Sequence, residues 1–194
     1  MSELTCEFIN GHYIVEYQDK KMVLDTGTPD TMVDSIMGVM SVKSIGEMIG
    51  TDIDGLLGMD VIGQHTIQID GKTITLSDEP AGVDSDPIDI ELLMGVPVVD
   101  ISVNGQSYRA ALDTGASLSY LRSVDTFGFK AIGKKVDFYP LFGKFNTAIY
   151  DADISIGDKP FNLMLGKLPD TLEEMLATIG IDAIIGTEFF TQIK

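Results

Sequence analysis

The sequence is poor in cysteine and histidine, and each shortage excludes a class of chemistry. Cys6 is the one cysteine among 194 residues, so no disulfide framework can form, which fits a reducing, cytoplasmic environment. The two histidines, His12 and His65, have no cysteine or acidic partner at metal-ligand spacing and leave little basis for Ser-His-Asp chemistry. No glycine motif that cradles phosphate is present. We therefore expect neither a metal nor a cofactor.

Positive charge and long apolar runs are also scarce. The net charge of −17 argues against nucleic acid or an anionic membrane as partner and serves solubility. No run is long enough to cross a bilayer, and the acidic first five residues do not resemble a signal peptide. Hydrophobic residues at 44% and charged residues at 22% indicate a globular protein of one large or two small domains.

One short motif occurs twice in the chain. Leu24-Asp25-Thr26-Gly27 and Leu112-Asp113-Thr114-Gly115 each end an apolar run, which is typical of a buried strand leading into a tight turn. Upstream, residues 13–21 align without a gap on residues 101–109. Downstream, residues 53–59 match residues 181–187. A single Asp-Thr-Gly could be an ordinary turn, whereas two in register with matching flanks indicate internal duplication.

Hydrophobic-Asp-Thr-Gly followed by hydrophobic-hydrophobic-Gly resembles the aspartic proteases, both pepsin-like and retroviral-type, over nearly the whole chain. The resemblance implies an all-β, two-lobed acid-protease-like β-barrel fold of duplicated retropepsin-like halves, with a few short helices. The N-terminal lobe would span residues 1–84 and the C-terminal lobe residues 85–194. The boundary would fall in the acidic, proline-bounded segment of residues 77–87.

The same resemblance implies an aspartic endopeptidase in which Asp25 and Asp113 activate a water molecule between them. Two carboxylates that close cannot both ionise, so they share one proton and act together as base and acid. One chain supplies both aspartates, so a monomer suffices. A homodimer that pairs equivalent aspartates from two chains is an alternative, as is a catalytically silent peptide-binding or scaffold protein on the same fold.

The residues around the two aspartates have expected supporting roles. The threonines would hydrogen-bond across to the opposite loop, and the glycines would offer N–H groups to the carboxylates. The Thr28 hydroxyl could bond Asp25, whereas Ala116 cannot do this for Asp113, which predicts a mildly acidic to near-neutral working pH. These loop-support residues are Thr26, Gly27, Thr28, Thr114, Gly115 and Ala116.

The segment between the Asp-Thr-Gly motif and the hydrophobic-hydrophobic-Gly motif is longer in the second half than in the first. Its extra segment includes residues 135–149, which alternate on both sides of Pro-Leu-Phe-Gly and predict a β-hairpin. By resemblance this hairpin is a flap over an extended peptide or protein substrate, whereas the first half is trimmed and flap-less. A helix is expected to start at Asp170, with Glu173 at the capping-box position. The flap residues expected to bind substrate are Tyr139, Leu141, Phe142 and Gly143.

Overall fold

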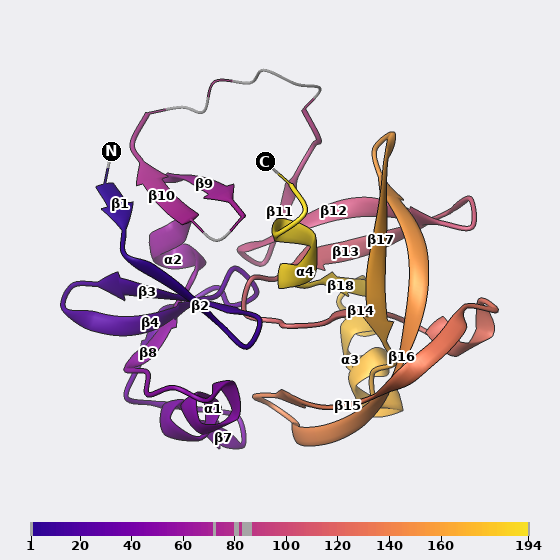
Figure 1. Cartoon of the computed structure of the whole chain (residues 1–194), viewed down its shortest axis with the longest axis horizontal. Helices are drawn as coiled ribbons and strands as arrows, with labels where there is room; N and C mark the ends of the chain where they lie inside the picture. Colours follow the sequence, from indigo (N-terminus) through magenta and orange to yellow (C-terminus); the bar gives the residue numbers. More distant parts are fainter. Residues whose placement is uncertain (1, 72, 80–81, 83–86, 194) are drawn as a thin grey trace.

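The protein is mostly β structure, and the two halves of the chain lie side by side (Figure 1). This computed structural model describes residues 2–71, 73–79, 82 and 87–193. Strands make up 49% and helices 15%, so the expected mostly β content with short helices is confirmed. The expected lobe boundary at residue 84, with much of the linker around it, lies outside the described residues.

The first half is built on a sheet that delivers the first Asp-Thr-Gly motif. The turn between its first two strands is Asn10-Gly11, whose φ angles of 47° and 84° suit the Asn-Gly turn that joins paired strands. The sheet runs in the order β2 (Cys6–Ile9), β3 (His12–Tyr17), β4 (Lys20–Leu24), β8 (Gly55–Leu57) and β5 (Met32–Val33).

Two smaller sheets and two helices complete this half. The hairpin of β9 (Thr66–Asp70) and β10 (Thr73–Ser77) is flanked by β1 (Ser2–Leu4). A short hairpin consists of β6 (Ile36–Met37) and β7 (Met40–Ser41), followed by α1 (Val42–Ile49). Helix α2 (Met59–Ile62) comes directly after β8.

The second half is built on one larger sheet. Strand β12 pairs with both β13 and β16, so the sheet bends back on itself. Its strands run in the order β11 (Glu91–Leu93), β12 (Val96–Val103), β13 (Gln106–Leu112), β18 (Ala183–Ile185), β14 (Ser119–Leu121), β17 (Lys159–Gly166), β16 (Gly143–Ile156) and β15 (Lys130–Tyr139). The helices are a 3-10 turn (Val124–Thr126), α3 (Asp170–Thr178) and α4 (Thr187–Phe190).

Helix α3 begins where the sequence indicates but without the expected capping box. Asp170 is its first residue, and Pro169 precedes it with no side-chain cap. The Glu173 carboxylate instead accepts the backbone N–H of Ser123 at 3.2 Å. Glu173 therefore ties the helix to the turn after β14 and does not close its own N-terminus.

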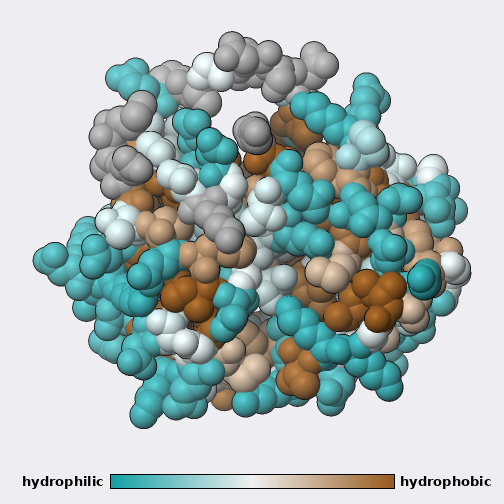
Figure 2. All heavy atoms as spheres, viewed as in Figure 1, coloured by the Kyte–Doolittle hydropathy of each residue, from teal (hydrophilic) through white to brown (hydrophobic). Residues whose placement is uncertain are grey.

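One hydrophobic core runs through both halves. Its largest cluster joins buried residues of β3 and β4, such as Tyr13 and Leu24, to buried residues of the second half, such as Leu112 and Ile185. Burial of this apolar surface is the main stabilising term, so the halves stabilise one another. The face seen in Figure 2 is largely hydrophilic, with separate hydrophobic patches between polar residues. Within the described chain, every helix is too short or too polar to cross a bilayer.

Candidate active site

Both Asp-Thr-Gly loops are held by the same backbone arrangement. Strand β4 pairs in parallel with β8, and the N–H of Asp25 donates to Leu57 O at 3.0 Å. Strand β13 pairs in parallel with β18, and the N–H of Asp113 donates to Ile185 O at 2.9 Å. The hydrophobic-hydrophobic-Gly segments of the sequence are thus the strands that fix the position where each aspartate leaves its own strand.

The threonines of the two loops hydrogen-bond across the centre of the molecule. The Thr26 N–H donates to Thr114 Oγ1 at 3.0 Å, and the Thr114 N–H donates to Thr26 Oγ1 at 3.0 Å. Each hydroxyl then donates to the opposite strand, Thr26 to Leu112 O at 2.7 Å and Thr114 to Leu24 O at 2.8 Å. These are the bonds expected of the two threonines, and they fix one loop relative to the other.

The glycines allow the two loops to approach each other closely. The Gly27 N–H donates to Asp25 Oδ1 at 3.0 Å, and the Gly115 N–H donates to Asp113 Oδ1 at 2.8 Å. A Cβ atom at Gly27 would overlap the carboxylate of Asp113, and one at Gly115 would lie 2.5 Å from Cγ of Asp25. Each aspartate therefore lies against the glycine of the other loop, and any larger residue would separate the pair.

Asp25 and Asp113 hydrogen-bond each other at the floor of a cavity. Burial raises the pKa of the Asp25 carboxyl well above its ordinary value, and the negative charge of Asp113 raises it further. Burial also raises the pKa of the Asp113 carboxyl, against the opposing effect of the Gly115 N–H. Two carboxyl groups in contact with raised pKa values hold one proton between them over a wide pH range.

The residues that follow the two glycines differ from the expectation in one respect. The Thr28 hydroxyl donates to the carbonyl oxygen of Asp30 at 3.4 Å and not to the Asp25 carboxylate. The chain turns at Pro29, which brings the Asp30 carbonyl within reach of the buried Thr28 side chain. The backbone N–H of Thr28, after that of Gly27, partly offsets the raised pKa of Asp25, and the N–H of Ala116, after that of Gly115, does the same for Asp113.

The β15–β16 hairpin covers the paired aspartates, and two of its four expected substrate-binding residues face them. Tyr139 and Leu141 line the cavity of about 310 Å³ above the aspartates. Burial and then the charges of Asp113 and Asp25 raise the pKa of the Tyr139 hydroxyl to about 12, so it stays protonated at neutral pH. Phe142 and Gly143 do not line this cavity: Phe142 is 43% exposed and packs against Phe145, and Gly143 forms the turn with a φ of 91°.

The first half, expected to be flap-less, contains a short β6–β7 hairpin that reaches the tip of the β15–β16 hairpin. The N–H of Val39 donates to Pro140 O at 3.0 Å, and Gly38 lies directly against Leu141. Figure 1 shows the β15 hairpin extending toward β7 and α1. The sequence signal for this turn was a glycine, Gly38, between two pairs of apolar residues. Its φ angle in the structure is 59°. The long hairpin therefore covers the cavity, and the short hairpin from the other half contacts its tip.

Further lining residues come from places that sequence reasoning missed. Ile45 and Ile49, on the buried face of α1, line the cavity together with Val23 and Leu56. Their spacing of four residues on a helix was the available signal. Apart from the motif loops and Tyr139, the cavity lining is apolar.

A second, much smaller cavity of about 30 Å³ lies on the other side of Asp113. Its walls include Tyr120, whose hydroxyl donates to the buried Asp137 carboxylate in a short hydrogen bond. His12 also lines it, with Nδ1 at 3.0 Å from the carbonyl oxygen of Asn10. Burial lowers the pKa of the His12 ring, which favours the neutral form.

Two further points concern metal binding and related proteins. Within the part of the chain that the structure describes, no three His, Cys, Asp or Glu side chains form a group that could hold a metal ion. His65 lies apart from the aspartates, on the surface beside Asp78. No known protein family matches this chain, and no curated protein matches it either.

Proposed function

We propose that this protein is an aspartic endopeptidase on a two-lobed, acid-protease-like fold, with Asp25 and Asp113 as its catalytic pair. The observation that carries the proposal is the pair itself: two hydrogen-bonded carboxylates from two equivalent loops, at the floor of a covered cavity. Structural aspartates are seldom held in contact with one another, because like charges that close destabilise the folded state. Such a pair with raised pKa values is typical of a functional site.

The chemistry follows from the single shared proton. The ionised carboxylate accepts a proton from a water molecule as the water oxygen attacks the peptide carbonyl carbon. The protonated carboxyl donates its proton to the carbonyl oxygen, which gives a neutral tetrahedral diol. When the C–N bond breaks, the protonated carboxyl donates its proton to the leaving nitrogen, and the ionised carboxylate accepts the proton of one diol hydroxyl, so the pair again holds one proton. Because the two groups titrate together, neither aspartate has a permanent role as acid or base.

The surrounding residues support this reaction by fixing geometry and by excluding bulk water. The reciprocal threonine bonds hold the two carboxylates at one separation, and such positioning accounts for a large part of catalysis in general. The roof of Tyr139, Pro140 and Leu141 lies over the pair. An extended peptide would enter when the β6–β7 and β15–β16 tips part, and would pair its backbone with the covering hairpin.

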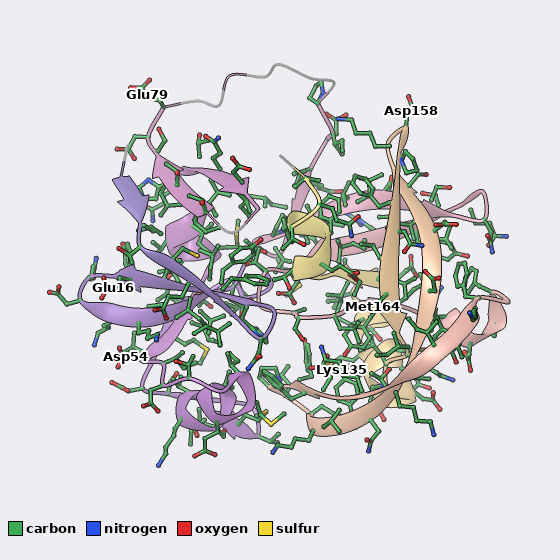
Figure 3. The ribbon with its side chains drawn as sticks, in the orientation of Figure 1. Glu16, Asp54, Glu79, Lys135, Asp158 and Met164 are labelled. Carbon is green, nitrogen blue, oxygen red and sulfur yellow. The ribbon has the colours of Figure 1, made fainter. Side chains whose placement is uncertain are left out.

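The test is cleavage of an unbiased peptide mixture between pH 3 and pH 8. We expect wild-type protein to cleave, and we expect Asp25→Asn and Asp113→Asn each to lose at least about a hundredfold in rate, the lower range for general acid–base catalysis. Asp158→Asn is the matched control, because Asp158 lies at the exposed tip of the β16–β17 hairpin, far from the covering hairpin in Figure 3. It should leave the rate unchanged.

Two results would contradict the proposal. If folded wild-type protein cleaves no peptide in this range, a peptide-binding role without catalysis becomes the better explanation. If Asp25→Asn alone abolishes cleavage while Asp113→Asn does not, the shared-proton mechanism is wrong. A molecular mass in solution equal to one chain would agree with the pairing of both aspartates within one molecule.

A further inference from the structure

The two cavities that open from the aspartates differ about tenfold in volume. The larger, about 310 Å³, is lined by both aspartates and extends on the Asp25 side to Ile45, Ile49 and Leu56 of the first half. The smaller, about 30 Å³, extends from Asp113 into the wall of the second half. A site built from two equivalent loops is therefore strongly unequal on its two sides, and the inequality must come from residues outside the loops.

One pair of equivalent positions shows where the inequality begins. Met32 pairs with Leu56 in the first half, and Tyr120 pairs with Ile184 at the matching place in the second half. Tyr120 lines the smaller cavity, whereas Met32 does not line the larger one. The first-half wall therefore stays open toward α1, while an aromatic ring occupies the corresponding space in the second half.

The long strands of the second half fill that wall further. Phe145, on β16, packs against Tyr120 with ring centroids 6.2 Å apart, and both line the smaller cavity. Leu168 completes the wall. None of the described strands of the first half is as long as β16 or β17, and Ile45 and Ile49 of α1 line the larger cavity.

Tyr120 cannot move aside to admit a large group. Its ring lies against the backbone of Gly166, where a Cβ atom would come within 2.5 Å of Cε1. Its hydroxyl is bound to Asp137, which is 7% exposed and also accepts the N–H of Phe138 at 2.8 Å. Withdrawing the ring would break a buried hydrogen bond and force the backbone apart.

We propose that the site takes a bulky apolar side chain on the Asp25 side of the cleaved bond and only glycine, alanine or serine on the Asp113 side. This inference rests on the proposed function, since it names the substrate class of the same site. A space of about 30 Å³ holds one water molecule or a methyl group, whereas about 310 Å³ accepts a leucine, methionine or phenylalanine side chain.

Binding of peptides that cannot be hydrolysed tests this without relying on turnover. Four peptides carry a reduced CH₂–NH group in place of the central amide and differ only in the flanking pair: Leu–Leu, Leu–Ala, Ala–Leu and Ala–Ala. We measure affinity for the wild-type protein by isothermal titration calorimetry. One of the two mixed peptides, Leu–Ala or Ala–Leu, should bind with an affinity about tenfold or more above that of the other three peptides, the range expected when an apolar pocket discriminates between side chains. Leu–Leu binding as tightly as the better mixed peptide would overturn the inference, as would no binding by any of the four.

Two variants locate the two subsites. Phe145→Leu enlarges the smaller cavity and should raise the affinity for the Leu–Leu peptide toward that of the mixed peptide. Ile45→Phe narrows the larger cavity and should weaken the preferred mixed peptide about tenfold. The ordinary amide of the preferred sequence then separates the two proposals. Selective binding without hydrolysis would leave the subsite inference standing and contradict the peptidase.

Discussion

Asp54 and Asp182 perform the same structural task in the two halves of the molecule. Asp54 Oδ2 accepts the backbone N–H of Lys21 at 2.8 Å, and Asp182 Oδ2 accepts that of Arg109 at 3.2 Å. In each half the aspartate N–H also donates to the carbonyl oxygen of the same partner residue. These aspartates thus join the two parallel strands at the end opposite the motif loop. This shared structural role explains why they repeat in the sequence although they lie outside the site.

We therefore expect Asp54→Ala and Asp182→Ala to reduce stability while leaving the aspartate pair intact. Each removes a carboxylate that accepts a backbone N–H, a loss of about 1–3 kcal/mol when the donor stays buried. Urea unfolding measures the change. The pH profile of the proposed peptide cleavage should keep its shape, and a displacement of that profile along the pH axis would show that these aspartates act on the pair of Asp25 and Asp113.

Replacing Thr26 or Thr114 by alanine should be more costly. Thr114 is fully buried and Thr26 is 7% exposed, so each substitution removes two buried hydrogen bonds, one from a backbone N–H and one to a backbone carbonyl oxygen. Two lost buried bonds predict a fall of about 2–4 kcal/mol in the free energy of unfolding. Serine keeps the hydroxyl and should restore most of the stability. If serine and alanine are equally destabilising, methyl packing and not hydrogen bonding holds the loops.

The sequence predicted the centre of the molecule better than its periphery, for a physical reason. The motif loops are defined by local chemistry, a buried strand followed by Asp-Thr-Gly, and the duplication doubles that signal. The first-half hairpin at Gly38 was missed because strands of two residues leave almost no alternation to detect. The Thr28 hydroxyl was misassigned because its bond to Asp30 depends on the path of the chain after Pro29.

Residues that shape the cavity walls were beyond sequence reasoning because they depend on long-range packing. Nothing local to Tyr120 predicts that its hydroxyl meets Asp137 on another strand. His12 reaches the second half only because the Asn10-Gly11 turn packs against Ser117. The apolar alternation of β15–β16 predicted the hairpin itself, but not which of its residues face inward, since that depends on where the hairpin twists over the site.

The raised pKa values of Asp25 and Asp113 predict how stability changes with pH. A carboxyl whose pKa is higher in the folded state keeps a proton that the unfolded chain releases, so folding loses stability as pH rises through that interval. Asp25→Asn or Asp113→Asn removes one charge of the pair. Each variant should therefore be more stable than wild type at pH 7. Every pKa unit by which folding raises the pKa of the removed carboxyl corresponds to about 1.4 kcal/mol.

Unfolding by urea at pH 4, 5.5 and 7 measures this difference directly. The gap between variant and wild type should widen as pH rises, because the folded wild-type pair keeps a proton that the unfolded chain releases, and the variant lacks one of the two carboxyl groups that share it. The other carboxylates are common to both proteins and cancel in the comparison. A gap that stays constant over this range would mean that the two carboxyl groups do not share a proton.

Gly38→Ala should loosen the roof of the site, and Gly71→Ala supplies a matched control. Both glycines have left-handed φ angles, 59° and 60°, so alanine adds a similar strain of about 1 kcal/mol at each. A Cβ at Gly38 would lie 2.6 Å from Cα of Leu141, whereas one at Gly71 would meet nothing within 4 Å. Gly38→Ala alone should therefore separate the two hairpin tips, break the bond from the Val39 N–H to Pro140 O, and raise the KM for peptide.

Hydrogen exchange over residues 36–41 should accelerate in Gly38→Ala only. Equal exchange in both variants would show that the tips do not hold each other in solution.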